Sequence, residues 1–223
     1  MLVAGIDVWR KQWVAVVLCD GRYEEAFVEA KLGRVLEALA GTASIGIDVP
    51  LGVTSGTTRR TADSEARKFV GPRRSSVFPT YPREVYEAPD YDAAREMCRN
   101  LTGGSISQQA YALKERLLEL EGVAKGRLGV FEVHPEVSFH EMAKRDLSWA
   151  KTSWNGLNER MQLLRDQGIK IATKIDEIGN AGSEDLLDAA AAAWSANRIA
   201  NGTASSLPAP PQEANGRQIA IWY

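Results

Sequence analysis

Two aspartates interrupt apolar, strand-like runs in which a charged side chain is unfavourable. The same four residues, GIDV, occur at positions 5–8 and 46–49, and they contain Asp7 and Asp48. A carboxylate is rarely buried in a strand unless another group compensates its charge. If the two strands are neighbours, the carboxylates repel each other and raise each other's pKa. A divalent cation relieves this repulsion, and oxygen ligands suit Mg²⁺ or Mn²⁺, so the pattern predicts a metal site.

A second acidic group begins the long helix that we expect over residues 183–202. Asp185 and Asp188 are three residues apart. Their side chains therefore lie about 5–6 Å from each other on one helix face and can contact the same ligand. Glu184 lies beside them in the chain. The competing explanation is that acidic residues in a first helical turn interact favourably with the helix dipole whether or not they have a function.

A third acidic group surrounds a histidine in the segment VFEVHPE. Glu132 and His134 are two residues apart, so they share one face of the strand that we expect there. Glu136 follows just after the proline. His134 could act as a base or as a ligand, and the alternative is a structural histidine whose ring nitrogens are satisfied by hydrogen bonds.

Positive charge is concentrated after the second GIDV segment. Between Ser55 and Arg83, seven basic and two acidic residues give +5, which leaves −7 for the rest of a chain whose net charge is −2. Such a patch suits a phosphate-bearing partner, although a solvated helix face with ordinary ion pairs accounts for it equally well. The candidate phosphate-binding residues in this segment are Arg59, Arg73, Arg74, Ser75 and Ser76. Phe78 and Tyr81 either offer stacking faces for a base or pack the segment onto the core.

The hydrophobic pattern predicts an α/β fold. Apolar runs predict strands over residues 2–8, 13–20, 23–30, 44–50, 127–136 and 216–223. Helical patterns cover residues 31–40, 61–71, 90–100, 107–122, 137–146, 156–168 and 183–202. Thr61 and Ser183 are the expected N-caps of two of these helices, and Gly71 and Gly202 their expected stops. The first three strands form an antiparallel meander, and residues 72–84, with three prolines, form an ordered but irregular loop.

The composition is that of an ordinary globular protein, with 44% hydrophobic and 25% charged residues. No apolar run approaches the roughly 20 residues of a membrane span. The first residues lack the features of a signal peptide. Cys19 and Cys98 have no CxxC partner, so neither a zinc site nor a disulfide framework is indicated. We therefore expect a cytoplasmic protein without a membrane partner; the oligomeric state does not follow from these features.

The order of the elements resembles that of the RNase H-like nucleases and transferases. That layout has three strands, a helix and a fourth strand, followed by a late helix that carries D-x-x-D. Carboxylates on the first and fourth strands and on the late helix of such proteins hold two metal ions about 4 Å apart, which activate water and stabilise the leaving oxygen. The carboxylate arrangement is most similar to that of RuvC-type Holliday junction resolvases. The resemblance implies that the metal ligands are Asp7, Asp48, Asp185 and Asp188.

Longer motifs resemble one family, the domain of unknown function 429 (DUF429), described as a predicted nuclease with an RNase H fold. They are RTADSEAR, GPRRSSVFPTYPR, ISQQAYALKERLLE, VFEVHPEVSF, KTSWNGLNERMQLL and EDLLDAAAAAW. The resemblance spans nearly the whole chain. It implies a single RNase H-like domain over residues 1–223, with a mixed five-stranded sheet flanked by helices. Residues from about 51 to 125 would form a basic, helical insertion after the fourth strand, overhanging the site.

These features favour a metal-dependent phosphodiester hydrolase, a nuclease that uses clustered carboxylates and a metal-activated water. Asp7, Asp48 and Asp188 would bind Mg²⁺ or Mn²⁺, with Asp185 and Glu136 as secondary ligands or orienting groups. The substrate-binding residues would be Arg73, Arg74, Ser75, Ser76, Arg59 and His134.

Two alternatives remain open at the level of the sequence. The first is a non-catalytic protein that binds phosphate or nucleic acid on the same fold. The second is a phosphohydrolase or phosphotransferase acting on a small nucleotide-like metabolite, which the overall acidity mildly favours over long duplex DNA. The chain has no GxxxxGK[ST] or GxGxxG motif, which weighs against an ATPase or a dinucleotide-binding enzyme.

Overall fold

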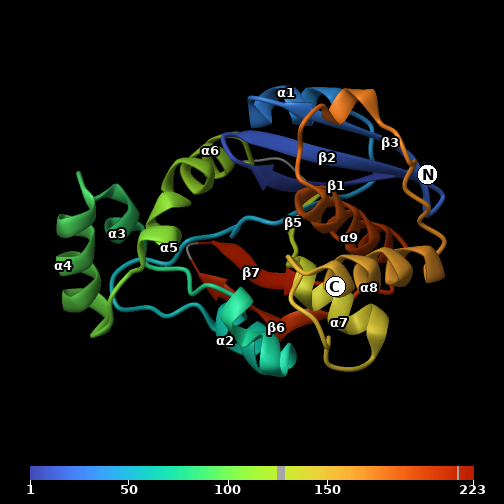
Figure 1. Cartoon of the computed structure of the whole chain (residues 1–223). Coiled ribbons are helices and arrows are strands. Elements are labelled where there is room, and N and C mark those ends of the chain that lie inside the picture. The colour runs from blue at the N-terminus through green and yellow to red at the C-terminus, as the bar shows by residue number, and fades with distance from the viewer. Residues whose placement is uncertain (125–128, 215) are drawn as a thin grey trace.

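A five-stranded mixed sheet forms the centre of the protein. The computed structural model describes residues 1–124, 129–214 and 216–223 (Figure 1). The strand order is β3-β2-β1-β4-β5. The strands are β1 (Leu2–Trp9), β2 (Gln12–Cys19), β3 (Arg22–Glu29), β4 (Ile45–Ile47) and β5 (Val130–Glu132). The first three form an antiparallel meander, and β4 and β5 continue the sheet in parallel with β1. The α/β class and the mixed five-stranded sheet predicted from the sequence are confirmed.

The two GIDV segments lie side by side in this sheet. β1 and β4 pair in parallel, with Gly5 opposite Gly46. The backbone N–H of Asp48 donates a hydrogen bond to the carbonyl oxygen of Ile6 at 2.9 Å. Parallel strands bring their carboxyl-terminal ends to the same edge of a sheet. Asp7 and Asp48 therefore lie together at that edge, as the sequence predicted.

Helices cover both faces of the sheet (Figure 1). α1 (Leu32–Ala38) and α6 (Lys114–Ala124) pack with Ile6 and Val17 on one face, whereas α9 (Ser183–Ala200) packs with Val3 and Val16 on the other. Because side chains alternate along a strand, Val3, Gly5 and Asp7 all face α9. The sheet is therefore covered by helices on both faces, and this explains why β1 and β2 are almost wholly apolar.

Glycines and alanines allow α9 to contact the sheet at backbone distance. A Cβ atom on Gly5 would lie 2.1 Å from the carbonyl oxygen of Ala189 and from the amide nitrogen of Ala193. A Cβ atom on Gly46 would lie 2.5 Å from the carbonyl oxygen of Ala192. The glycine that precedes each strand aspartate thus makes room for the helix. The same helix carries Asp188 one turn before Ala192.

Replacing Gly5 by alanine is expected to lower the free energy of unfolding by about 3 kcal/mol, because the new methyl group would meet helix backbone that cannot move independently. At about 2–4 °C per kcal/mol, the melting temperature should fall by roughly 6–12 °C. Urea denaturation measures the effect. Gly33→Ala in α1 is the matched control, since a Cβ there has no neighbour within 4 Å. Equal losses in the two variants would contradict this account of the packing.

Further helices complete the protein. They are α2 (Thr61–Phe69), α3 (Arg83–Glu87), α4 (Tyr91–Thr102), α5 (Gln108–Ala112), α7 (Pro135–Ala143) and α8 (Trp154–Asp166), with 3₁₀ helices at Gly71–Ser76 and Asp176–Ile178. The segment between β4 and β5 holds α2 to α6. Residue 125 of the predicted insertion and residues 127 and 128 of the predicted strand lie outside the described residues. No helix in the described part of the chain is long and apolar enough to cross a membrane.

Several predicted boundaries were wrong. The helix expected over 107–122 is two helices, α5 and α6. Arg60 and Gly182 occupy the N-cap positions of α2 and α9, so Thr61 and Ser183 are instead the first residues of these helices. The predicted glycine stops, by contrast, are confirmed: Gly71 and Gly202 directly follow the C-cap residues of α2 and α9, with positive φ angles of 52° and 68°. The loop expected over 72–84 starts inside a 3₁₀ helix and ends in α3.

The C-terminal strand pairs with a partner that the sequence did not indicate. β6 (Ser206–Ala214) and β7 (Arg217–Trp222) form a separate two-stranded sheet that packs with α2. β6 contains three prolines, which lack the N–H that a strand ladder needs. The pairing register shifts between Leu207 and Gln212, so the proline-rich stretch is left out of the ladder. This bulge explains how a strand with three prolines forms.

Candidate metal centre

Three carboxylates meet at the carboxyl-terminal edge of the parallel strands. One carboxylate oxygen of each of Asp7, Asp48 and Asp188 lies within 4.8 Å of the others. They come from β1, from the residue just after β4, and from the second turn of α9. Asp7 and Asp188 are buried, and Asp48 is partly exposed. The close packing of α9 on Gly5 and Gly46 brings the helix aspartate to the two strand aspartates.

The ionised forms of these carboxylates are destabilised. Burial raises the pKa of Asp7 well above its ordinary value, and the charges of Asp48 and Asp188 raise it further. Burial raises the pKa of Asp188 to about 6, although Lys151 opposes the shift. Burial also raises the pKa of Asp48, against the effects of His134 and Lys151. A cation between the three groups would remove both the repulsion and much of the desolvation penalty.

Lys151 is a residue of this site that the sequence reasoning missed. Its Nζ atom donates a hydrogen bond to Oδ2 of Asp188 at 2.6 Å. Desolvation opposes the charge of Lys151, but Asp188, Asp7 and Asp48 together raise its pKa. The residue lies in the turn before α8 and is the first residue of the KTSWNGLNERMQLL motif. Its place in that motif is a signal that could have marked Lys151 as a site residue. The spacing of residues along the chain does not link Lys151 to the three aspartates.

Glu136 lies beside the three aspartates and is held by an arginine. Its Oε1 atom accepts a hydrogen bond from Nη2 of Arg160 at 2.5 Å, and both side chains are buried. The charge of Glu136 raises the pKa values of Asp48 and Asp188. Its Oε2 atom is buried and, among the described residues, has no hydrogen-bond partner. Glu136, predicted to be a secondary ligand or orienting group, is not one of the carboxylates that lie within 4.8 Å of one another, so its demonstrated link to the cluster is the effect of its charge.

Asp185 is not brought into the cluster, although it lies one turn from Asp188. Burial raises its pKa, whereas hydrogen bonds from the backbone N–H groups of Gly182 and of Asp185 itself lower it. The carboxylate thus binds the N-terminal end of its own helix. This contact is what the helix-dipole explanation of the acidic first turn requires.

His134 and Glu132 do not share a strand face, because β5 ends at Glu132. His134 is the N-cap of α7, and its Nδ1 atom accepts a hydrogen bond from the N–H of Glu136 at 3.2 Å. The buried carboxylate of Glu132 accepts a hydrogen bond from the guanidinium group of Arg60 and another from the backbone N–H of Leu51, the latter at 2.7 Å. Burial raises the pKa of Glu132 to about 8, against the effect of Arg60. Glu132 is therefore bound to Arg60 at the start of α2, whereas His134 is close enough to Asp48 to lower its pKa.

Five of the predicted phosphate-binding residues lie just before or just after α2, and the sixth, His134, is the N-cap of α7. Arg59 donates to the carbonyl oxygen of Thr102, and Arg73 donates to that of Leu147. Ser75 and Ser76 end the 3₁₀ helix Gly71–Ser76. Arg74 lines an open hollow of about 580 Å³ together with Ser64, Arg67, Lys68 and Gly71. The hydrogen bonds of Arg59 and Arg73 and the hollow beside Arg74 thus involve other residues than the three aspartates.

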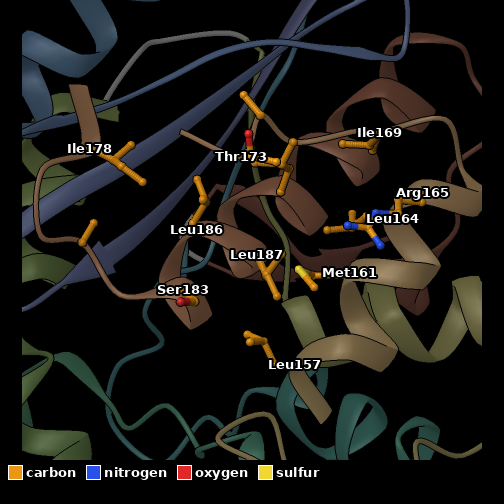
Figure 2. Close-up of a pocket in the computed structure, with 13 residues that line it drawn as sticks. Leu157, Met161, Leu164, Arg165, Ile169, Thr173, Ile178, Ser183, Leu186 and Leu187 are labelled. Carbon is orange, nitrogen blue, oxygen red and sulfur yellow. The ribbon is translucent and has the colours of Figure 1, made fainter. Parts of the chain in front are cut away.

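Two pockets adjoin each other beside α8 and α9. The first is an apolar cavity of about 410 Å³ between α8 and α9, with Met161 and Leu187 among its lining residues (Figure 2). A second pocket, of about 430 Å³, shares Leu157 and Ser183 with the first. Its lining includes Lys151 and also Trp154, whose surface is 75% exposed. Glu184 and Asp185 also line this pocket, whereas the three clustered aspartates do not, so it is Lys151 that links the pocket to the cluster through its contact with Asp188.

A family comparison identifies the chain. The model of the family described as "Protein of unknown function (DUF429)" matches residues 5–213, so the chain belongs to this family. The matched region includes the two GIDV segments, Lys151 and all of α9. Searches of curated proteins and of solved structures gave no match to the chain.

Proposed function

We propose that this member of the DUF429 family is a divalent-metal-dependent phosphodiester hydrolase. The observation that carries the proposal is the convergence of Asp7, Asp48 and Asp188, with one oxygen of each within 4.8 Å of the others. Ions that bind oxygen at about 2.1–2.4 Å hold ligand atoms up to about 4.2–4.8 Å apart. The cluster therefore has the dimensions of a shared coordination site. An all-oxygen donor set favours Mg²⁺ or Mn²⁺ over softer metals.

The surrounding residues fit this role. The backbone N–H of Val8 donates to Oδ1 of Asp7 at 2.7 Å, which orients that carboxylate. Arg160 holds Glu136 through Oε1 and leaves Oε2 without a hydrogen-bond partner among the described residues, so Glu136 can orient a group bound at the cluster. When bound, a divalent cation would supply the Lewis acidity that activates water. The pocket beside Lys151 would receive the substrate, and the exposed indole of Trp154 offers a face on which a base can stack.

The proposal is tested with labelled single-stranded, duplex and branched DNA and RNA in the presence of Mg²⁺ or Mn²⁺. Cleavage of at least one substrate is expected, with its complete loss in excess chelator. Asp48→Asn should reduce the rate by about 100-fold or more, because one charge that holds the cation is removed. Failure to cleave any of these substrates, or equal cleavage by the variant, would contradict a nuclease function.

A small phosphate ester is a second candidate substrate class. The pocket beside Lys151 measures about 430 Å³, which is within the range of small-ligand pockets. The net charge of −2 also gives the protein no general attraction for long polyanions. The same assay therefore includes linear and cyclic nucleotides, with release of inorganic phosphate or ring opening as the readout. Turnover of these compounds without cleavage of any polymer would identify a metabolite phosphohydrolase on the same metal centre.

A further inference from the structure

The ammonium group of Lys151 already places one positive charge inside the carboxylate cluster. Nζ of Lys151 lies 2.6 Å from Oδ2 of Asp188, and the exposed fractions of the two side chains are 42% and 4%. The lysine therefore extends from a surface turn into a buried acidic site. The charges of Asp7 and Asp48, whose carboxylate oxygens lie within 4.8 Å of one of Asp188, also raise the pKa of Lys151.

The charges of the site balance with a single divalent cation. Three ionised aspartates contribute −3 and Lys151 contributes +1, which leaves −2. The charge of Glu136 is matched by Arg160, and Glu132 belongs to a separate buried group in which Arg60 pairs with both Glu132 and Asp63. One divalent cation makes the remaining site neutral. A second would leave a charge of +2 in a largely buried region and would lie next to an ammonium group that repels it.

We propose that Lys151 takes the place of a second metal ion, so that the centre binds one divalent cation. In this arrangement Asp7 and Asp48 hold the cation, and Asp188 is shared between the cation and Lys151. The inference rests on the proposed function and deepens it, because two-ion centres use the second ion to stabilise the leaving oxygen. An ammonium has three donors, and Lys151 directs one of them to Asp188.

The position of Lys151 suits contact with the substrate. The residue lines the pocket of about 430 Å³ that contains Trp154, and this pocket is open to solvent. The donors of Lys151 that Asp188 does not use can therefore reach an oxygen of a phosphate ester bound there. The positive charge that a second ion would supply at the leaving oxygen is, in this protein, supplied by a side chain.

Manganese binding tests the inference without measuring activity. Isothermal titration calorimetry is expected to give one Mn²⁺ per wild-type chain, and electron paramagnetic resonance to show an isolated ion. Lys151→Met keeps the length of the side chain but removes its charge, so this variant should bind two Mn²⁺ with a magnetic interaction between them. Lys151→Arg keeps the charge and should bind one. Lys174→Met removes an exposed lysine that pairs with Asp176, and it should also bind one.

The outcomes separate this inference from the function on which it rests. Two magnetically interacting ions in the wild type would overturn the role of Lys151 and leave the metal-dependent function intact. A single ion in Lys151→Met, with the wild-type circular dichroism spectrum retained, would overturn it as well. The absence of Mn²⁺ binding in the wild type would instead contradict the proposed function itself.

Discussion

Replacing Asp7 by asparagine is expected to abolish divalent-cation binding and, at the same time, to make the cation-free protein more stable. Asp7 is buried beside two other carboxylates, and burial and these two charges raise its pKa. An amide of the same shape carries no charge and can still accept the N–H of Val8. At pH 7–8 the free energy of unfolding should therefore rise in the variant, because a raised pKa means that the ionised carboxylate costs folding free energy.

The pH dependence of stability gives a second readout of the same effect. Asp188 has a pKa of about 6 in the folded protein, compared with an ordinary value of 3.8. Between these two pH values the folded state binds more protons than the unfolded state, so the free energy of unfolding falls as pH rises. Urea denaturation in excess chelator from pH 4 to 8 should show this decline, and Asp7→Asn should make it shallower. An unchanged slope in the variant would contradict the repulsion between these carboxylates.

The cation should reverse the order of stability of the two proteins. Mn²⁺ at about 100 times its dissociation constant is expected to stabilise the wild type by about 2.7 kcal/mol and Asp7→Asn not at all. Hydrolysis by the variant should fall by about 100-fold or more. Asp185→Asn is the matched control, because Asp185 lies one turn from Asp188 and binds the end of its own helix. Equal loss of Mn²⁺ binding in both variants would place Asp185 among the ligands.

Replacing Arg160 by methionine is expected to destabilise the protein by about 3–5 kcal/mol, the range found when one partner of a buried ion pair is removed. Arg160 is 1% exposed and donates to Oε1 of Glu136 at 2.5 Å and to the carbonyl oxygen of Gly156 at 3.0 Å. Without the guanidinium group, Glu136 would be an unpaired buried charge next to Asp48 and Asp188. The melting temperature should fall by roughly 6–20 °C.

A double-mutant cycle separates the charge effect from the loss of packing. Glu136→Gln removes the charge that Arg160 balances, so the double variant Arg160→Met/Glu136→Gln should regain at least half of the lost stability. Thermal unfolding in excess chelator measures all four proteins. If the double variant were as unstable as Arg160→Met alone, the loss would come from the packing of Arg160 over the ring of Phe139 and not from the uncompensated carboxylate.

The sequence predicted the central sheet and named all three clustered aspartates, Asp7 and Asp48 from the strand pattern and Asp188 from the resemblance to RNase H-like proteins. Apolar runs of strand length, separated by short polar turns, determine a meander because neighbouring strands in sequence pair readily. The predicted adjacency of β1 and β4 followed from this layout, and it placed Asp7 and Asp48 together. The predictions that failed concern where individual helices begin or break: the N-caps are Arg60 and Gly182, and the chain breaks between α5 and α6.

The rest of the site was decided by tertiary contacts between residues far apart in the chain. Asp188 and Asp185 are equivalent by helical spacing, but only Asp188 meets the strand aspartates, because Gly5 and Gly46 determine where α9 crosses the sheet. Lys151 reaches the cluster from a turn that no local pattern links to it.

Hydrophobic periodicity is a local property, so the sequence alone determined which segments form strands. It thereby determined which acidic residues lie at the carboxyl-terminal edge of the sheet. Only the folded chain determined which acids lie close enough together to hold a cation and which basic groups pair with the others. Burial and the distances between charges, on which both depend, are set by the packing of α7, α8 and α9 against the sheet.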